Sequence, residues 1–305
     1  MQLIRGTTEF ELMQPAAVSI GKFDGIHRGH KQLLDRVIRK KEEGMQAVIF
    51  TFDPSPAEFF GKHPVRSVTT RAEKRRIFER MGIDVLIEFP LTEETAAMSP
   101  ESFVESVLVD KMHTSYVAAG TDVSFGSGGR GDHALLVSLG KRFGLTVEIV
   151  DKICVDGREI SSSFVREELE KGNMERVAEL IGAPYSITGT VVHGKRLGRT
   201  IGMPTVNLIP DADKLLPPNG VYYSQVSYRG DHYRSISNIG CKPTVSNENV
   251  MGVETYLYDF SEDIYGKDII VNLLSFKRPE MKFSSLEELK NQMQKDIAEG
   301  AKWDL

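Results

Sequence analysis

A ten-residue stretch close to the N-terminus constrains the fold more than any other part of the chain. Residues 21–30 read Gly-Lys-Phe-Asp-Gly-Ile-His-Arg-Gly-His, and they follow an apolar run at residues 16–20. After them, apolar side chains recur at helical spacing as far as Gly44, so the sequence predicts a strand, a glycine-containing turn and a helix. This arrangement brings backbone N–H groups and the positive end of a helix dipole to the carboxyl end of the strand, where open α/β sheets bind phosphates.

Two histidines in this stretch are candidate phosphate-binding residues. His27 and His30 are three positions apart, so they share one face of the first helical turn. Imidazoles placed there donate hydrogen bonds to a polyphosphate, and Gly29 lets the backbone approach it closely. A bare His-x-x-His pair is more often a helix cap or a surface feature, but the complete ten-residue string is far more specific.

The amino-acid composition limits the classes of protein to which the chain can belong. The 305 residues suffice for two domains, and 40% apolar with 27% charged residues is ordinary for a soluble globular protein. A net charge of −5 argues against a dedicated nucleic-acid-binding protein, although nucleotides need only local donors. Cys154 and Cys241 form neither a metal-ligand spacing nor a disulfide framework. No apolar run is long enough to span a membrane and no signal peptide is recognisable, so we expect a cytoplasmic protein.

The order of strand-like and helix-like stretches differs between the two halves. In the first half they alternate, which predicts an α/β domain with a doubly wound parallel sheet. The expected strands are 16–20, 47–52, 85–89, 116–119 and 146–150, and the expected helices are near 71–81, 101–112 and 133–143.

Beyond Pro184, short strands follow one another without helices between them, which predicts a small antiparallel β-barrel. The expected strands are 187–192, 221–228, 235–239, 253–258 and 269–275. Ser285 and Glu288 form a capping-box pattern before a terminal helix. We therefore place the domains at 1–184 and 185–305.

Two stretches after predicted strands of the first half are candidate ligand-binding segments. The glycine-rich loop at residues 120–131, which contains Asp122, allows close approach of a ligand, although such loops are common. The serines at 161–163 stand at the start of a predicted helix, shortly before Arg166. Hydroxyls at that position cap the helix, and together with an arginine they also form an anion site.

A basic, glycine-rich stretch at 194–208 has the features of a phosphate loop without being a Walker A sequence. Its glycines, cations and first hydroxyl are Gly194, Lys195, Gly198, Arg199 and Thr200. Thr205 and Asn207 follow two positions apart on an extended segment, so both side chains point to the same side. Their hard oxygens suit Mg²⁺ bound together with ATP phosphates.

These motifs, in this order over nearly the whole chain, resemble the bacterial bifunctional riboflavin kinase/FAD synthetases. The string at 21–30 resembles the nucleotidyltransferase signature of that family, G-x-F-D-G-x-H-x-G-H. Residues 160–166 resemble its I-S-S-[ST]-x-[IV]-R motif, and residues 194–207 resemble its kinase motif G-x-x-x-G-R-x-x-G-F-P-T-A-N. The resemblance implies a Rossmann-like nucleotidyltransferase domain followed by a riboflavin kinase barrel.

For the barrel, the resemblance implies phosphorylation of riboflavin to FMN with Mg-ATP. Glu254 matches the general base that takes the proton from the ribityl 5′-hydroxyl, and Arg278 and Phe283 lie in the segment that borders the flavin. Thr205 and Asn207 would hold the metal.

For the first domain, the resemblance implies that FMN is joined to AMP from a second ATP, giving FAD and pyrophosphate. His27 and His30 would stabilise the α-phosphoryl transition state. The residues that would seat the nucleotide are Gly21, Phe23, Asp24, Gly29, Asp122, Ser161, Ser162, Ser163 and Arg166.

Two positions depart from the family pattern. Ser55 stands where the loop T-F-x-P-H-P has histidine, and Val123 replaces the usual aromatic residue. Three alternatives therefore stay open at this point. They are a riboflavin kinase with weakened adenylyl transfer, a flavin-sensing regulator that binds RNA or protein, and a nucleotidyltransferase for another phosphorylated substrate. The sequence leaves the oligomeric state open and favours small-molecule substrates over membranes or nucleic acid.

Overall fold

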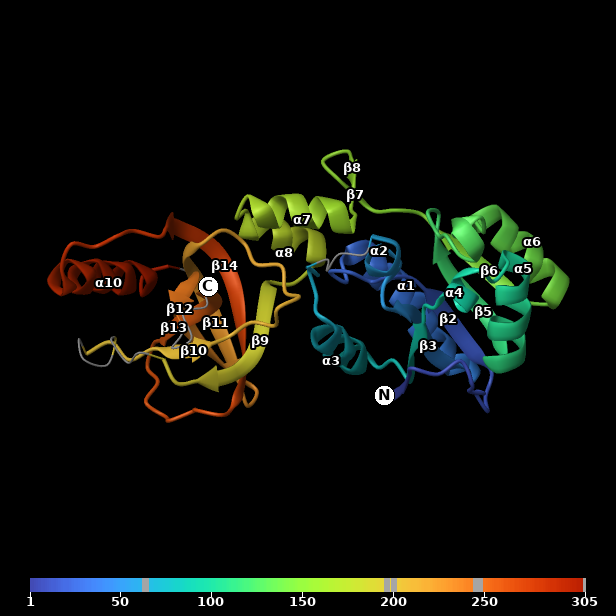
Figure 1. Ribbon diagram of the computed structural model, residues 1–305, viewed down its shortest axis with the longest axis horizontal. Coiled ribbons are helices and arrows are strands. Elements are labelled where there is room, and N and C mark those ends of the chain that lie inside the picture. The colour runs from blue at the N-terminus through green and yellow to red at the C-terminus, as the bar shows by residue number, and fades with distance from the viewer. Residues whose placement is uncertain (62–65, 195–197, 199–201, 244–248, 304–305) are drawn as a thin grey trace. The chain divides into compact units, whose positions relative to one another are not determined.

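The protein is described by a computed structural model that divides into two compact units, residues 1–162 and 163–305 (Figure 1). The description excludes residues 62–65, 195–197, 199–201, 244–248 and 304–305.

The first unit is built on a six-stranded sheet with the order β1-β4-β3-β2-β5-β6, and every pair in it is parallel. The strands are β1 (Gln2–Arg5), β2 (Ala16–Ile20), β3 (Gln46–Asp53), β4 (Val85–Pro90), β5 (Thr114–Gly120) and β6 (Thr146–Val150). From β2 the chain builds β3 and β4 on one side and then β5 and β6 on the other. The topological switch point therefore lies between β2 and β5, which is where such sheets bind ligands.

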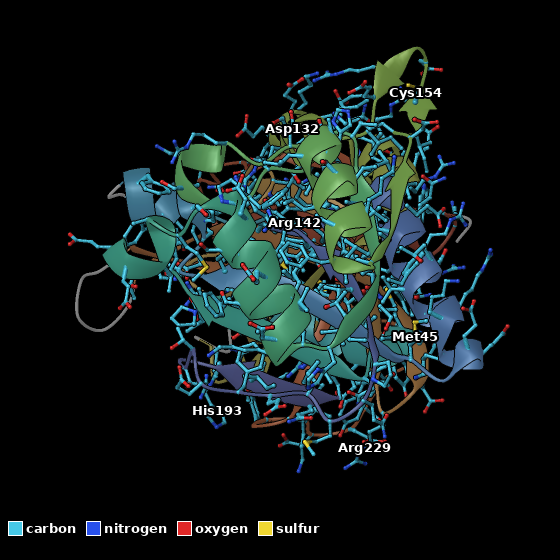
Figure 2. All side chains as sticks on the ribbon, turned by 90° about the vertical axis from the view of Figure 1, so that its right-hand side faces the viewer. Met45, Asp132, Arg142, Cys154, His193 and Arg229 are labelled. Atoms are coloured by element: carbon cyan, nitrogen blue, oxygen red, sulfur yellow. The ribbon has the colours of Figure 1, made fainter. Side chains whose placement is uncertain are left out.

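Helical segments connect the strands of this unit. They are α1 (Arg28–Arg39), η1 (Lys40–Glu43), α2 (Pro56–Gly61), α3 (Arg71–Met81), α4 (Glu93–Ala96), α5 (Pro100–Ser102), the π-helical η2 (Phe103–Lys111), η3 (Ser127–Gly129) and α6 (His133–Phe143). Asp132 caps the start of α6 and Arg142 lies in its last turn, and both are labelled in Figure 2. Each charge thus matches the sign that the helix dipole favours at that end.

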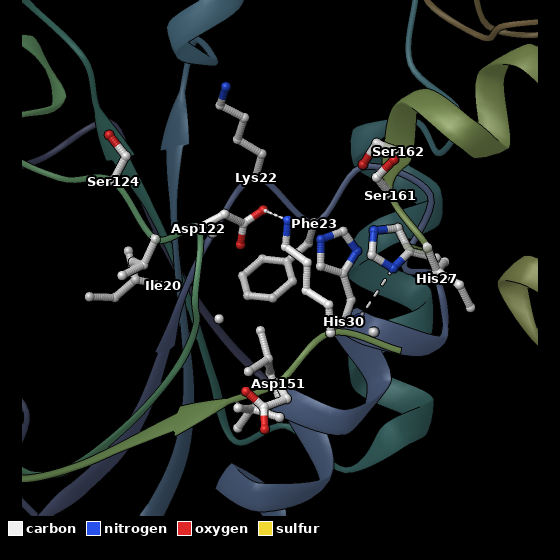
Figure 3. Close-up of a pocket in the computed structure, with 18 of the residues that line it drawn as sticks. Ile20, Lys22, Phe23, His27, His30, Asp122, Ser124, Asp151, Ser161 and Ser162 are labelled. Atoms are coloured by element: carbon white, nitrogen blue, oxygen red, sulfur yellow. Dashed lines mark hydrogen bonds and ion pairs between the residues drawn. The ribbon is translucent and has the colours of Figure 1, made fainter. Parts of the chain in front are cut away.

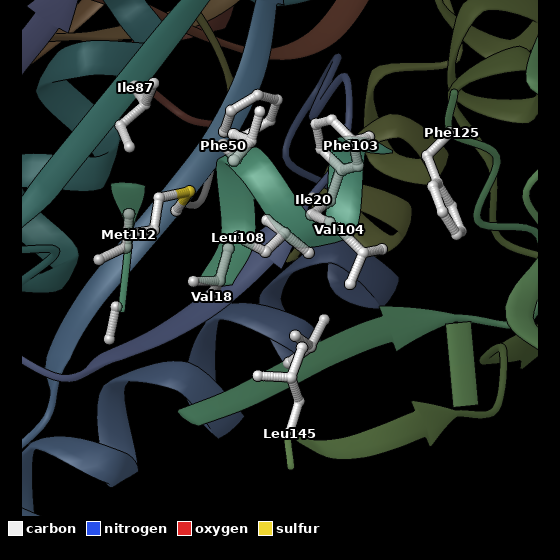
Figure 4. Packing of buried hydrophobic residues seen from close by; sticks show 14 of the residues in the cluster. Val18, Ile20, Phe50, Ile87, Phe103, Val104, Leu108, Met112, Phe125 and Leu145 are labelled. Atoms are coloured by element: carbon white, nitrogen blue, oxygen red, sulfur yellow. The ribbon is translucent and has the colours of Figure 1, made fainter. Parts of the chain in front are cut away.

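Both faces of the sheet are buried, because alternate residues of each strand point to opposite sides. One face packs against η2 and α6 around Phe50, whose ring centroid lies 5.3 Å from those of Phe52, Phe89 and Phe103 (Figure 4). The other face packs against α1 and α3. The sheet is therefore covered by helices on both sides.

The second unit begins with α7 (Ser162–Glu170), which starts at the unit boundary, and α8 (Met174–Ile181). Its strands close an antiparallel barrel in the order β10-β13-β12-β11-β14-β9. They are β9 (Tyr185–Val192), β10 (Val206–Leu208), β11 (Gly220–Tyr228), β12 (Asp231–Pro243), β13 (Asn249–Leu257) and β14 (Asp268–Pro279). The helix α10 (Leu286–Gly300) ends the chain, and Ser285 caps it by accepting from the Glu288 N–H.

The predicted fold class is confirmed in both units, and the structure adds elements that the pattern did not indicate. The edge strand β1 is short and mostly exposed, so it lacks the apolar run that reveals a buried strand. The hairpin of β7 (Cys154–Val155) and β8 (Arg158–Glu159) has strands too short to show a period. Cys154 lies on this hairpin (Figure 2).

The observed division between the units lies at 162/163, whereas the expected domain boundary lies at 184/185. The helices α7 and α8 fall between these two positions. The helix α8 packs against β9 and β14, so it belongs to the barrel unit in space although the periodicity changes only after Pro184. The boundary at 184/185 stays a prediction.

Replacing Phe50 by alanine removes a fully buried ring from the core of the first unit. We expect Phe50→Ala to lower the free energy of unfolding of this unit by about 3–5 kcal/mol, because a cavity remains among the neighbouring rings. Hydrogen exchange of the β3 amides measures the loss. Phe60→Ala is the control, since the Phe60 side chain is 63% exposed, and an equal loss in both variants would contradict the assignment of the core.

Candidate functional site

The first unit has a cavity of about 310 Å³ at the switch point of its sheet (Figure 3). The ends of β2, β5 and β6 and the first turn of α1 contribute to its wall. Among the lining residues are Gly21, Phe23, His27, Gly29, His30, Asp122, Val123, Lys152, Ser161 and Ser162. The sequence-predicted residues of this half therefore gather at one place, with the exceptions described below.

The two histidines stack on each other at the wall of this cavity. Their ring centroids are 3.7 Å apart and their planes differ by 19°. His27 is the N-cap of α1, and its Nδ1 accepts a hydrogen bond of 3.4 Å from the His30 backbone N–H. A neutral His27 ring that accepts through Nδ1 carries its proton on Nε2, which leaves that N–H as a donor. Nδ1 of His30 is buried and has no hydrogen-bond partner among the described residues.

Burial keeps both imidazoles uncharged at neutral pH. Desolvation lowers the pKa of His27 to about 4, against the opposing charges of Asp122 and Asp24. Desolvation also lowers the pKa of His30 well below its usual value, and the neighbouring His27 adds to the effect. Each neutral ring keeps one N–H group, with which it can donate a hydrogen bond to an anion.

The turn before α1 is held by its own residues. Phe23 is fully buried with a φ of +49° and packs edge-on against Phe78. Gly29 leaves room for the His27 ring, because a Cβ at position 29 would lie only 3.2 Å from Nδ1 of His27. Asp24 is not among the residues that line the cavity. Its carbonyl oxygen accepts from the Ser162 hydroxyl at 2.9 Å and thereby ties the serine to the turn.

Ser55 has a structural role at the start of α2. Its hydroxyl accepts from the Glu58 N–H at 3.3 Å, and the Glu58 carboxylate accepts from the Ser55 N–H at 2.8 Å. This reciprocal pair has the form of a capping box. Pro56 and Phe52 line the cavity, whereas Ser55 is not among the lining residues.

The second unit has two cavities that share Thr205. One, of about 220 Å³, lies between the barrel and α10, and the other, of about 350 Å³, lies beside residues 260–265. The lining of the first includes Gly198, Thr205, Asn238, Glu254, Arg278, Glu280, Phe283 and Asp296. Arg278 donates from Nε to the Asp296 carboxylate at 3.1 Å, which ties the barrel to α10.

Strand pairing brings the predicted kinase residues together. Asn207 of β10 lies opposite Glu254 of β13, and the Thr205 hydroxyl donates to the Glu254 carboxylate at 2.6 Å. Gly194 lies against Asn207, since a Cβ at position 194 would come within 2.4 Å of the Asn207 amide nitrogen. The described lining of the two cavities includes Thr205 but not Asn207.

Each half of the chain matches a known protein family. The FAD synthetase family model matches residues 10–164, and the riboflavin kinase family model matches residues 181–303. The bifunctional riboflavin kinase/FMN adenylyltransferase of Haemophilus influenzae is 35% identical over 301 residues, which cover 97% of each chain. The chain belongs to this bifunctional family. The Escherichia coli member is also 35% identical, over 97% of this chain and 96% of its own.

A solved structure resembles the whole chain as well. The crystal structure described as a macrolide-efflux protein from Streptococcus pneumoniae is 28% identical, with a TM-score of 0.86 and 99% coverage of both chains. Among the helices of the described residues, none has the length and apolar character that crossing a membrane requires.

For five residues of the family motifs, membership of these two sites stays a prediction. Lys195, Arg199 and Thr200 lie outside the described residues. Ser163 and Arg166 lie on α7 in the second unit, so their approach to the histidines stays a prediction.

Among the described residues that line the sheet-unit cavity and the cavity beside α10, sequence reasoning missed five that carry charges: Lys22, Asp151, Lys152, Glu280 and Asp296. Lys152 could have been found, because it follows β6 closely at the carboxyl edge of the sheet. Asp296 could not, because an acidic residue on a terminal helix ordinarily faces solvent.

The lowered pKa of His27 predicts an unusual titration. The Cε1 proton resonance of His27, assigned with a His27→Gln variant, should titrate with a midpoint near 4 instead of 6.5. Because the unfolded state binds a proton that the native state refuses between these values, folding stability should rise with pH over this window. A midpoint near 6.5 would contradict the buried, neutral pair.

The close packing of Gly194 predicts a selective loss. In Gly194→Ala the new Cβ displaces the Asn207 side chain, because the available distance is 2.4 Å. We expect the rate of FMN formation from riboflavin to fall at least about tenfold, which corresponds to an increase of roughly 1.4 kcal/mol in the activation free energy. Gly230→Ala is the control, since a Cβ at 230 meets nothing within 4 Å although the turn is strained. The assay measures FMN by chromatography, and equal activity in the two variants would contradict the role of Asn207.

Proposed function

We propose that this chain phosphorylates riboflavin to FMN in its barrel unit and adenylylates FMN to FAD in its sheet unit, using one ATP in each step. One observation carries the proposal. Each unit has its own cavity, one lined by His27 and His30 and the other by Thr205 and Glu254. These residues come from the two motif sets of the family, so each cavity holds the groups that one of the two reactions needs.

In the barrel, the position of Thr205 suggests how the two substrates meet. The cavity beside α10 is lined by Arg278 and Phe283 and would take the flavin. The cavity beside residues 260–265 would take the nucleotide. Thr205 lines both, and the Glu254 carboxylate accepts a hydrogen bond from its hydroxyl. A phosphoryl group entering at Thr205 would therefore lie next to the carboxylate that takes the proton from the flavin's terminal hydroxyl.

The donor set of the barrel fits a magnesium ion. Thr205 and Asn207 offer a hydroxyl and an amide oxygen on one extended segment, beside the Glu254 carboxylate. When bound with ATP, Mg²⁺ neutralises phosphate charge and orients the transferred group. In the protein itself, the pairing of β10 with β13 sets Asn207 opposite Glu254, and the Thr205 hydroxyl donates to the Glu254 carboxylate.

In the sheet unit, catalysis would consist of positioning and charge neutralisation, because the attacking phosphate of FMN is already an anion. His27 and His30 would donate hydrogen bonds to the α-phosphoryl group as neutral imidazoles. Ser161 and Ser162 line the same cavity, and Ser163 with Arg166 would complete the phosphate site. We place the domains at 1–184 and 185–305 and the enzyme in the cytoplasm.

One observation favours a second candidate, a riboflavin kinase with weakened adenylyl transfer. Ser55 occupies the family's histidine position and is engaged in capping α2. If a histidine there contributes a donor, its loss slows FAD formation alone. A Ser55→His variant that raises FAD output with unchanged FMN output would support this candidate.

Replacing Glu254 by glutamine tests the division of labour. The amide cannot accept the proton of the ribityl hydroxyl, so we expect FMN formation from riboflavin and Mg-ATP to disappear. Conversion of supplied FMN to FAD should survive, because Glu254 belongs to the barrel cavity. Loss of both reactions would refute separate sites, and thermal unfolding of the variant serves as the folding control.

A further inference from the structure

Lys152 is a charged group of the sheet-unit cavity to which neither the family motifs nor the proposed mechanism gives a role. It follows β6 and lines the cavity together with the two histidines. Its amine lies 3.3 Å from the Asp122 carboxylate and 2.9 Å from the Glu159 carboxylate. The ion pair with Asp122 is drawn as a dashed line in Figure 3.

The cavity needs a cation, because its histidines are neutral while its substrates are anions. Among the described lining residues, Lys22 and Lys152 are the permanent cations. The side chain of Lys22 is exposed and extends away from the histidines in Figure 3. The side chain of Lys152 is only 28% exposed, and its charge acts on His27, whose pKa it lowers. Lys152 is therefore the better placed of the two.

The ion pair of Lys152 with Asp122 is weak enough to be exchanged. The Asp122 side chain is 70% exposed, and an ion pair that is solvated to this extent contributes little free energy. A hydrogen bond between a charged donor and a phosphate in a cavity is stronger. The exchange of the Asp122 carboxylate for a phosphate in the cavity is therefore favourable in free energy for the amine. Glu159 lies on β8 and is not among the lining residues, so its ion pair with the amine restrains Lys152 from outside the cavity and opposes the exchange.

We propose that Lys152 is a phosphate-binding residue of the adenylyl-transfer site, which moves from the Asp122 carboxylate to a phosphoryl group when substrate binds. This inference rests on the proposed adenylyl transfer and adds a residue to it. The phosphoryl group belongs either to ATP or to FMN, and the two sources are separable by experiment.

The test uses the full-length chain and measures the KM for ATP and for FMN in FAD formation, and the KM for pyrophosphate in the reverse reaction. Lys152→Met should raise a KM by about 10- to 100-fold, which corresponds to the loss of one charged hydrogen bond. A rise for ATP and pyrophosphate assigns the contact to ATP, and a rise for FMN alone assigns it to the flavin phosphate. Lys152→Arg should keep each KM within a few-fold of the unmodified chain.

Glu159→Gln provides the decisive comparison. It weakens the restraint on the amine without touching the cavity, so the same KM should fall by up to about fivefold. If Lys152 only anchored the hairpin, Lys152→Met and Glu159→Gln would both slow FAD formation. That result would overturn the inference. Unchanged KM values in Lys152→Met would also overturn it.

Two controls separate failure of this inference from failure of the proposed function. Lys141→Met removes an exposed lysine in the last turn of α6 and should leave every KM unchanged. FMN formation by the barrel should be unaffected in all variants. An unmodified chain that forms no FAD would refute adenylyl transfer and this inference with it. FAD formation that is indifferent to Lys152 would refute this inference alone.

Discussion

The stacking of His27 on His30, at the first turn of α1, is the interaction on which the proposed chemistry of the sheet unit depends. A helix N-terminus attracts anions, and burial removes the positive charge from the two rings. The result is a set of neutral donors aimed into a cavity at the switch point of a parallel sheet. Gly29 keeps this arrangement open, because a Cβ there would press on the His27 ring.

The proposed phosphate site of the barrel is built differently. Its candidate groups are fixed by strand register, since β10 sets Asn207 opposite Glu254 of β13. Two cavities of the barrel unit share Thr205, whereas the candidate groups of the sheet unit lie around one cavity. Two candidate sites of unlike construction on one chain agree with the bifunctional family to which it belongs.

Much of the fold could be predicted from the sequence, because buried parallel strands appear as apolar runs and the helices between them keep a clear period. The edge strand β1 and the hairpin β7–β8 could not, since short exposed strands carry no such signal. For the site, motif spacing indicated the histidines and the threonine–asparagine pair. It did not indicate Lys152, although the position of this residue shortly after β6 offered a signal, and it could not reveal Asp296, whose position depends on its tertiary contact with Arg278. Nor could it show that Ser55 caps a helix.

Product stoichiometry tests most directly whether one chain carries two independent ATP-dependent sites. Riboflavin is incubated with the purified chain and excess Mg-ATP, and FMN, FAD, ADP and pyrophosphate are quantified over time. Two sites predict that FMN appears before FAD, and that each FAD formed is accompanied by one ADP and one pyrophosphate. FMN with ADP but no pyrophosphate, or no flavin product at all, would contradict the two-site structure of the enzyme.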